Sequence, residues 1–324
     1  MIDFNKGTEQ FNKFLGSEKK TTFLYDGTIY MLKYPDPIKG SVLGGSLSYK
    51  NNQFSEHIGS LIFKSCGFVT HETVLGTFTD KNGKDKIVVG CKDFTQYGGN
   101  LYEMKMLANQ TNVNNEKTRD TIEAVYGIID DCPLIIDNQS IINGFWDMFV
   151  VDALIGNRDR HLGNWGLFEQ DGNVGFAPIY DCGSSLAAML SDDDMGELVR
   201  NPSLFKNGVY NATSCYTMNG NRIFYHEIFR DPPPELSEAI LRVAPRIDME
   251  EIRNIVNSVE VMSDIRKEYL IKALDMRYEQ ILEPALNREV EKMPIKEKLA
   301  FNQKKADAHN AKLPPKEPSK GIER

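Results

Sequence analysis

The sequence predicts an α+β fold in two parts: a small β-rich part with one helix over residues 1–94, and a larger helical part over residues 95–293. Two observations predict this division. Up to about residue 95, short β-branched and aromatic runs alternate with turns rich in Gly, Asn and Asp, which is typical of an antiparallel sheet. From residue 116 onward, apolar residues recur at the spacing of one helix face. Two such parts would meet in a cleft, a usual place for a small-molecule site.

The β-rich part begins with a predicted hairpin. Residues 21–34 read as two short strands around Asp26-Gly27, a dipeptide that favours a tight hairpin turn. A loop rich in Gly, Ser and Asn follows at 35–52. The remaining elements predicted in this part are a helix at 54–65 and strands at 72–78 and 86–91.

The second part is predicted to be mainly helical and to end in a polar tail. Helices are expected at 118–129, 141–155, 235–243, 249–256 and 264–290. Residues 294–324 hold eight Lys and Arg residues against four Asp and Glu residues, with few apolar ones. We expect this basic tail to be disordered, because it lacks the side chains that would join a core.

Charge and cysteine content narrow the function classes. The 324 residues carry a net charge of −8, which argues against a general nucleic-acid binder. No apolar run approaches the roughly 20 residues that span a bilayer, and the N-terminus has no apolar signal-peptide core. The five cysteines lack the spacing of a zinc site or of a disulfide framework. We therefore expect a soluble cytoplasmic protein without integral membrane association, for which only signal-peptide-independent export stays open.

The most informative stretch is the polar run GNRDRHLGNWG at residues 156–166. It follows a predicted helix and precedes a strand-like run at 174–180, which ends in Asp181-Cys182-Gly183. The order is helix, polar loop with Asp and Asn five residues apart, strand, and Asp-x-Gly. This order is typical of a phosphoryl-transfer site that binds ATP and Mg²⁺.

Three side chains in these motifs have separate predicted roles. Asp159 would orient an acceptor hydroxyl and take its proton as the new bond forms. Asn164 would turn back from the same loop to offer a neutral oxygen to Mg²⁺. Asp181 would offer a charged oxygen to the metal from a different segment.

A phosphate-binding lysine is expected on a strand of the β-rich part. Lys33 lies in such a strand, where Met31 and Lys33 would share one face and Tyr30 and Leu32 the other. The lysine needs a carboxylate partner. Glu56, near the start of the predicted helix, is the best candidate for that ion pair.

The chain resembles the HipA-like serine/threonine kinases. The segments NRDRHLGNWG and APIYDCGSSL look like the signature of that family, and YDGTIYMLKYP, SEHIGSLIF and KIVVGCKDF resemble its compact members. The likeness covers roughly residues 15–290. It implies a two-lobed protein-kinase-like fold, ATP as phosphoryl donor, Mg²⁺ as cofactor and a protein substrate with a Ser or Thr acceptor.

The resemblance also implies residue roles. It implies Asp159 as base, Asn164 and Asp181 as metal ligands, and the Lys33–Glu56 ion pair at the phosphates. Residues 89–94 would be the hinge, whose backbone at Cys91 and Asp93 reads the adenine. Gly16 and Ser17 lie where the family's phosphate loop occurs, although they form no G-x-G-x-x-G. Autophosphorylation is expected at Ser184, Ser185 or Ser17.

Purely structural roles are alternatives for several of these residues. Asp159 and Asn164 could simply cap a helix or stabilise a turn, as Asp and Asn often do. Lys33 could be an ordinary edge-strand lysine, and Glu56 a solvated helix residue. We expect His161 to hold the loop by a hydrogen bond, Asp152 to brace it, and the triplet at 192–194 to form a solvated turn.

Other functions are also open. The chain could be a lipid or small-molecule kinase, because phosphoinositide kinases also carry an Asp-Arg-His-x-x-Asn loop, or a nucleotide-binding scaffold without catalysis. A bacterial effector that is translocated into another cell is a further possibility. The sequence does not determine the protein substrate or the oligomeric state.

Overall fold

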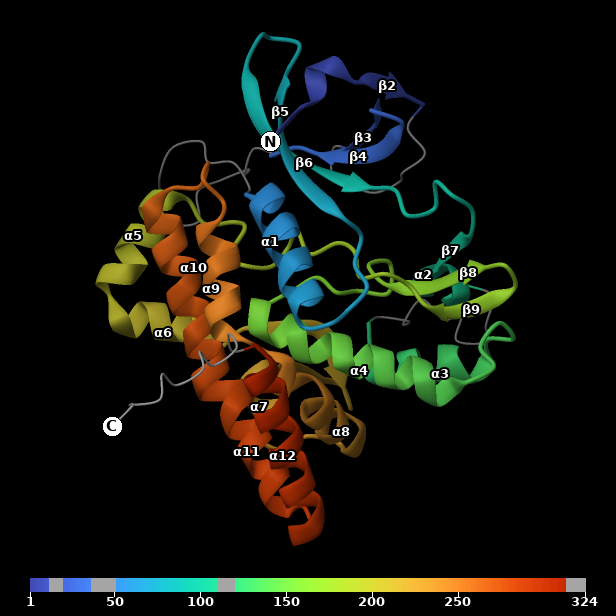
Figure 1. Cartoon of the computed structure of the whole chain (residues 1–324), viewed down its shortest axis with the longest axis vertical. Helices are drawn as coiled ribbons and strands as arrows, with labels where there is room; N and C mark the ends of the chain where they lie inside the picture. Colours follow the sequence, from blue (N-terminus) through green and yellow to red (C-terminus); the bar gives the residue numbers. More distant parts are fainter. Residues whose placement is uncertain (12–19, 36–50, 110–119, 313–324) are drawn as a thin grey trace, which may run out of the picture.

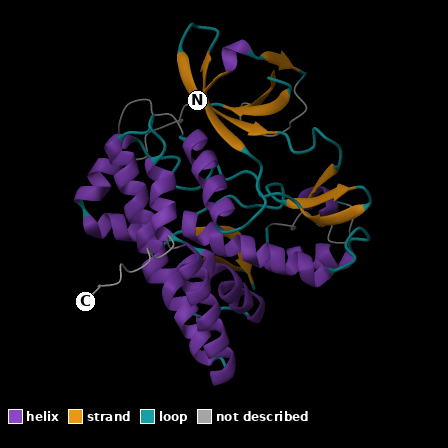
Figure 2. Ribbon diagram, in the orientation of Figure 1, coloured by secondary structure: helices purple, strands orange, loops and turns teal. Residues whose placement is uncertain are grey.

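The computed structural model describes residues 1–11, 20–35, 51–109 and 120–312. Figure 1 shows a β-sheet at one end of the molecule and a larger group of helices at the other, with helix α1 (Asn52–Ser65) between them. Figure 2 shows the same division by secondary structure. The predicted α+β class is confirmed. We call the sheet with α1 the N-terminal lobe and the remainder the C-terminal lobe.

The N-terminal lobe is built on one sheet of six strands in the order β1-β5-β6-β4-β3-β2. Its strands are β1 (Ile2–Asp3), β2 (Thr8–Gln10), β3 (Lys20–Tyr25), β4 (Thr28–Lys33), β5 (Thr73–Thr79) and β6 (Asp85–Lys92). The predicted hairpin is confirmed: β3 and β4 pair antiparallel, with Tyr25 opposite Thr28. Asp26 and Gly27 both take positive φ, as a tight hairpin turn requires. The short strand β1 was not predicted, and it pairs parallel to β5.

Phe4 fixes the N-terminus against the sheet. It lies in a 3₁₀ turn, η1 (Phe4–Lys6), and its ring is fully buried. Gly76 and Gly90 provide the space for this ring, because a Cβ at either position would lie 2.6 or 2.5 Å from its atoms. The ring therefore requires glycine on both neighbouring strands.

The two faces of β4 differ as predicted. Leu32 packs with Phe4, Phe23 and Val88 in a small core on one face. Met31 packs instead against the main core of the molecule. Lys33, which shares the face of Met31, is fully buried. The alternation of a strand thus turns the lysine inward, toward α1.

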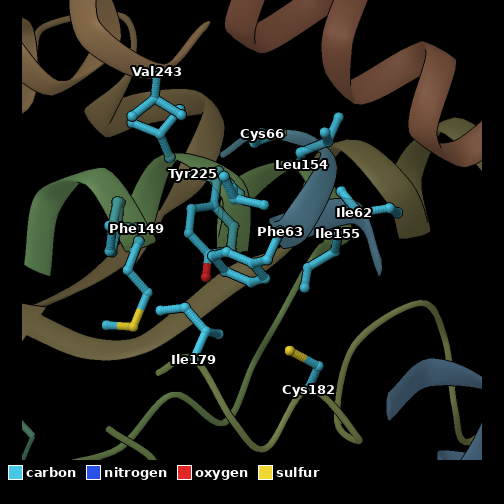
Figure 3. Close-up of a cluster of buried hydrophobic side chains, with 14 of the residues drawn as sticks. Ile62, Phe63, Cys66, Phe149, Leu154, Ile155, Ile179, Cys182, Tyr225 and Val243 are labelled. Carbon is cyan, nitrogen blue, oxygen red and sulfur yellow. The ribbon is translucent and has the colours of Figure 1, made fainter. Parts of the chain in front are cut away.

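Helix α1 joins the two lobes. Its buried Ile62 and Phe63 lie beside Leu154 and Ile155 of the C-terminal lobe (Figure 3). On the same helix, a Cβ at Gly59 would be only 2.6 Å from Cys182 Cβ, so α1 lies directly against the Asp-x-Gly segment. Glycine at position 59 makes this close approach possible.

The C-terminal lobe is centred on the long buried helix α4 (Asn138–Ile155). The other helices are α2 (Met104–Ala108), α3 (Ile122–Asp131), α5 (Asp192–Arg200), α6 (Pro202–Tyr210), α7 (Tyr225–Ile228), α8 (Pro234–Val243), α9 (Met249–Asn257), α10 (Asp264–Arg277), α11 (Glu283–Lys292) and α12 (Ile295–Lys312). Two short helical segments, η2 (Ala244–Arg246) and the π-helical η3 (Tyr278–Leu282), adjoin α8 and α11. Two small sheets complete the lobe: β7 (Asn100–Glu103), β8 (Gly166–Gln170) and β9 (Asn173–Phe176), and β10 (Thr213–Met218) with β11 (Asn221–Phe224).

The predicted helices of this lobe are present, with three differences. The helix predicted at 118–129 begins at Ile122, after the N-cap Thr121, and residues 118–119 lie outside the described residues. The run predicted at 264–290 is divided by η3 into α10 and α11. The tail expected to be disordered from residue 294 contains helix α12, while 313–324 lie outside the described residues. Alanine, lysine and glutamine, which favour helix, fill much of α12, and this local preference explains the helix where a core contact was not expected. Among the described helices, none is long and apolar enough to cross a membrane.

Candidate active site

The polar loop begins where helix α4 ends. Gly156 takes the left-handed conformation (φ 65°, ψ 43°) and its N–H donates to the Asp152 carbonyl, which closes the helix. Glycine is required here for a second reason: a Cβ would lie 2.5 Å from the guanidinium carbon of Arg277. Arg277 itself is buried and donates to the carbonyls of Leu154 and Val209, near the C-terminal ends of α4 and α6. The loop therefore leaves the helix in a fixed direction.

Asp152 supports the loop through buried hydrogen bonds, as predicted. Its carboxylate is fully buried and accepts from Arg160 Nε (2.9 Å), Arg160 Nη2 (3.1 Å) and the Asn157 side-chain amide (2.9 Å). Asn157 in turn accepts the backbone N–H of Asp159 at 3.0 Å. Tyr225 donates its hydroxyl to the Asn157 carbonyl at 2.6 Å. These contacts fix the backbone on which Asp159 stands.

Arg160 holds together the two segments predicted to bind the metal. Its Nη1 donates to the Asn164 carbonyl (2.9 Å) and also to the carbonyl of Tyr180, the residue before Asp181. Sequence reasoning missed this residue. The sequence indicates its buried partner Asp152, but nothing in it shows that the guanidinium reaches Tyr180, twenty residues further along the chain. Tyr180 lies beyond β9, because the strand predicted at 174–180 ends at Phe176.

Asp159 projects from this braced loop toward solvent. Its side chain is 52% exposed. One carboxylate oxygen, Oδ2, accepts the Ser184 hydroxyl at 3.3 Å. The other, Oδ1, is 4.0 Å from His161 Nε2. His161 accepts the Gly163 N–H through Nδ1 at 3.0 Å, which confirms its predicted role in holding the loop. The Asp159 carboxylate, which can accept a hydrogen bond from a hydroxyl group, therefore lies at the protein surface.

Asn164 is oriented by the same loop. Its side-chain amide nitrogen donates to the Asp159 carbonyl at 2.7 Å. The side-chain oxygen Oδ1 is thereby left as the atom that can face a ligand. This is the orientation that the predicted metal-binding role requires.

Lys33, Glu56 and Asp181 form a buried network between the lobes. Lys33 Nζ lies 2.7 Å from Glu56 Oε2 and 2.8 Å from Asp181 Oδ1. Lys33 and Glu56 are fully buried, whereas the Asp181 side chain is 22% exposed. The structure therefore brings the predicted ion pair together and adds Asp181 to it. Asp181 also has positive φ (57°), which is uncommon for a residue other than glycine.

The charges of this network stabilise one another. Burial disfavours the ammonium of Lys33, but Asp181 and Glu56 outweigh it and raise the pKa of Lys33 well above its ordinary value. Burial opposes ionisation of Glu56 and Asp181, but Lys33, helped by His71 at Glu56 and by Lys20 at Asp181, lowers the pKa of both carboxyl groups. All three groups are therefore charged at neutral pH, as phosphate and metal binding would need.

His71 and the Cys182 backbone hold the second oxygen of Glu56. Glu56 Oε1 lies 3.0 Å from His71 Nε2 and accepts the Cys182 N–H at 3.1 Å. The backbone N–H of His71 donates to the Ile179 carbonyl at 2.9 Å, two residues before Asp181. No local pattern in the sequence points to His71, because its partners lie on α1 and on the Asp-x-Gly segment.

The predicted hinge residues are largely engaged within the chain. Cys91 lies in the ladder of β6, opposite Met31 and Thr73. Asp93 donates its N–H to the Ile29 carbonyl and accepts the Gln96 N–H. In the ranges that the structure covers, the backbone of Phe94 has no hydrogen-bond partner. Phe94 is thus the position in the predicted hinge whose backbone is open to a ligand.

The other predicted positions have varied outcomes. Gly16 and Ser17 lie outside the described residues. Ser184 is exposed, whereas Ser185 is fully buried and donates its hydroxyl to the Cys182 carbonyl at 2.7 Å. The acidic triplet at 192–194 is not a turn but the first turn of α5. Ser191 and Asp194 form a capping box there, which explains the helix.

The donor set suits magnesium. Mg²⁺ prefers oxygen ligands and keeps several waters, so one carboxylate and one amide oxygen are enough protein ligands. Asp181 provides an ionised carboxylate that is still partly exposed, and Asn164 provides an amide oxygen whose nitrogen is already engaged. Arg160, bonded to the backbone of both segments, keeps them adjacent.

Comparison with known proteins gives consistent matches. Residues 15–259 match the family model described as the HipA-like C-terminal domain. The chain is 36% identical over 284 residues to the serine/threonine-protein kinase CtkA of Helicobacter pylori strain J99, covering 84% of this chain and 83% of that protein. The crystal structure of a Helicobacter pylori proinflammatory kinase CtkA matches with a TM-score of 0.81 at 33% identity, over 90% of this chain and 99% of the other. HipA of Shewanella oneidensis MR-1, in a complex with HipB and operator DNA, matches in fold alone, with a TM-score of 0.52 at 12% identity, over 85% of this chain and 67% of the other.

Proposed function

We propose, from the premise that the chain belongs to the HipA-like C-terminal domain family, that it is an ATP- and Mg²⁺-dependent protein kinase acting on serine or threonine. Its 36% identity to a serine/threonine-protein kinase supports a kinase-like function. The observation that supports ATP-dependent transfer to a hydroxyl is the arrangement of charges. Lys33, Glu56 and Asp181 form a network between the lobes, and the Asp159 carboxylate is exposed to solvent.

The proposed mechanism assigns each side chain a step. The acceptor hydroxyl donates its proton to Asp159, which orients its oxygen toward the terminal phosphorus. Lys33, whose position Glu56 fixes, binds the phosphate oxygens of ATP. Asn164 and Asp181 would hold Mg²⁺, which neutralises charge on the phosphates. The backbone of Phe94 would read the adenine, instead of Cys91 or Asp93 as the sequence suggested.

Activity tests the proposal directly. Purified protein is incubated with labelled ATP, Mg²⁺ and a basic protein substrate, alongside Asp159→Asn and Asp181→Asn, which keep side-chain size. We expect label on protein for the wild type and a loss of at least about a hundredfold in each variant, the scale of one acid–base or charge-stabilising group. Label on phospholipid but not on protein would favour a lipid kinase. ATP binding with no transfer would favour a scaffold.

Metal dependence is a separate test. Because Asp159 and Asp181 place negative charge near the phosphates, ATP should bind tightly only with Mg²⁺ present. Titration calorimetry with Mg²⁺ and with EDTA measures this. Equal affinity in both conditions would contradict the assignment of Asp181 as a metal ligand.

The protein substrate and the cellular location of the chain are further proposals. A protein substrate follows from the proposed activity, and autophosphorylation is part of it. Action as an effector outside the producing cell, after signal-peptide-independent export, is tested by immunoblot of culture supernatants against a cytoplasmic marker. Absence of the chain from the supernatant would contradict export.

A further inference from the structure

The hydroxyl of Ser184 already occupies the position that an acceptor hydroxyl must take. Its Oγ donates to Asp159 Oδ2 at 3.3 Å. Both side chains are exposed, so an incoming nucleotide can reach the hydroxyl. A general base must lie within hydrogen-bond reach of the proton that it removes, and this contact meets that requirement within one molecule.

The neighbouring serine provides a contrast. Ser185 is fully buried, and its hydroxyl donates to the Cys182 carbonyl at 2.7 Å. Its hydroxyl is therefore engaged within the turn and not with Asp159. The sequence does not distinguish these two adjacent serines, but the structure does. Ser184 contacts the candidate base, whereas Ser185 stabilises the turn in which Ser184 lies.

The turn itself holds Ser184 in place. The Ser185 N–H donates to the Cys182 carbonyl at 3.1 Å, and the Arg158 N–H donates to the Ser184 carbonyl at 3.5 Å. Ser184 is also only three residues from Asp181, the proposed metal ligand. A hydroxyl held against Asp159 reacts at a high effective concentration without encountering a second molecule.

We infer that Ser184 is phosphorylated by its own molecule, an inference that rests on the proposed kinase function. The Ser184 oxygen forms a bond to the γ-phosphorus of ATP, and the bond from that phosphorus to the β,γ-bridging oxygen breaks. The electron pair of the broken bond leaves with ADP. The serine proton passes to Asp159 and then to water.

The product closes the acceptor position. Phosphoserine carries about −1.5 to −2 charges at neutral pH, and here it stands beside the Asp159 carboxylate. Like charge and bulk both disfavour entry of another acceptor hydroxyl. Ser184 is therefore modified once per chain, and the modified chain transfers phosphate to external substrates more slowly.

The test begins with phosphatase-treated full-length protein, from which the phosphatase is then removed. Wild type, Ser184→Ala, Ser184→Thr, Ser185→Ala and the inactive Asp159→Asn are incubated with Mg²⁺ and labelled ATP over a dilution series. Tandem mass spectrometry maps the phosphate, and a basic substrate protein in parallel tubes measures external transfer. Melting temperatures establish that each variant is folded.

We expect phosphate on residue 184 in the wild type, in Ser184→Thr and in Ser185→Ala, and its loss in Ser184→Ala and Asp159→Asn. The rate per molecule should not change with dilution. Wild type pre-incubated with ATP should then phosphorylate the external substrate more slowly than fresh protein.

Two outcomes would overturn the inference while leaving the kinase proposal intact: external transfer by the wild type with no phosphate on Ser184, or a rate per molecule that falls with dilution. Absence of both external transfer and self-labelling in the wild type would instead contradict the proposed function, and the inference with it.

Discussion

At the scale of single residues, the site depends on charges that are buried with their partners. Lys33, Glu56 and Asp152 are fully buried, and Arg160 is nearly so. A buried charge is tolerable only when a counter-charge and hydrogen bonds replace the lost water, and both pairs meet this condition. Removal of one partner therefore costs more than removal of an exposed ion pair.

Lys33→Met should destabilise the fold by about 3–5 kcal/mol at neutral pH, because Glu56 keeps a buried charge without its ammonium. The sign of the pH dependence follows from the lowered pKa values of Glu56 and Asp181. A carboxyl group with a lowered folded pKa stabilises above its unfolded pKa, about 4, and loses that contribution as pH falls through the folded value. The melting-temperature difference between wild type and Lys33→Met should thus shrink below about pH 4.

The double variant Lys33→Met/Glu56→Gln is the matched control. It should recover most of the lost stability, since the fully buried carboxylate of Glu56 is gone and the remaining one, on Asp181, is 22% exposed. It should not recover activity. A melting-temperature difference that stays constant from neutral to acid pH would contradict a stabilising role for the network.

Asp152→Ala should cost about 3–5 kcal/mol, measured by urea unfolding, because Arg160 would remain buried without its carboxylate. The partly exposed pair Arg253–Asp275 provides the comparison, with 2.7 Å between Nη2 and Oδ1 but 43% and 25% side-chain exposure. Asp275→Ala should cost about 0–1 kcal/mol. Equal costs at the two positions would mean that burial of the Arg160 pair does not govern its contribution.

At the scale of elements, helix ends determine where the catalytic loop points. Gly156 ends α4 in the left-handed conformation, and Arg277 on α10 fills the space beside it. Burial lowers the pKa of Arg277 to about 10, so it is still a cation at neutral pH. Its charge lies where the partial negative charges of the C-terminal ends of α4 and α6 converge, which stabilises both ends. One arginine thus anchors the start of the loop.

Gly156→Ala should destabilise the fold through two effects: positive φ, at about 1 kcal/mol, and the overlap with Arg277, at about 2 kcal/mol more. Gly172 in the β8–β9 turn separates them, because it also has positive φ (79°) but a Cβ added there would have no neighbouring atom within 4 Å. Gly172→Ala should therefore show only the first effect. Thermal unfolding of both variants measures the difference, and equal shifts would contradict the packing role of Arg277.

Local signals in the sequence predicted more of the site than of the contacts that brace it. The strand alternation placed Lys33 on the inner face, and the motif order located Asp159, Asn164 and Asp181, because both signals are local. Arg160 and His71 were missed because their contacts join segments that are distant in the sequence. The lack of apolar residues in the C-terminal tail predicts disorder, but α12 forms there because its own residues favour helix.

At the scale of the whole molecule, the site is assembled from both lobes. Lys33 and Asp181 are 148 residues apart in sequence, and their side chains meet at 2.8 Å. Helix α1 carries Glu56 and lies against Cys182, so the lobes share one packed core at the site. The first apolar side chains of helix α12, in contrast, lie mostly outside this core: Ile295 and Leu299 are 80% and 66% exposed, although Phe301 packs partly against it.

Deletion of residues 295–324 should leave phosphoryl transfer unchanged and cost about 1 kcal/mol of stability or less, the scale of one partly buried aromatic side chain. Initial rates on an external substrate and the melting temperature measure the two quantities. Phe301→Ala in the full chain should reproduce the stability change alone. A collapse of activity on truncation would mean that the tail belongs to the catalytic unit.

The reactivity of the free cysteines can report local opening of the fold. All five are free, and Cys66, Cys91, Cys132 and Cys182 are buried. Burial raises the pKa of the Cys182 thiol to about 12 and that of Cys91 well above its ordinary value, so a thiol reagent modifies neither until the fold opens. Cys91 and Cys182 both lie at Glu56: the Cys91 sulfur is within 4.8 Å of its carboxylate, and the Cys182 N–H donates to it. Cys66 and Cys132 lie instead at the C-terminal ends of α1 and α3. The order in which the four react with a thiol reagent under native conditions therefore reports whether the lobes separate at the site before the remaining structure unfolds.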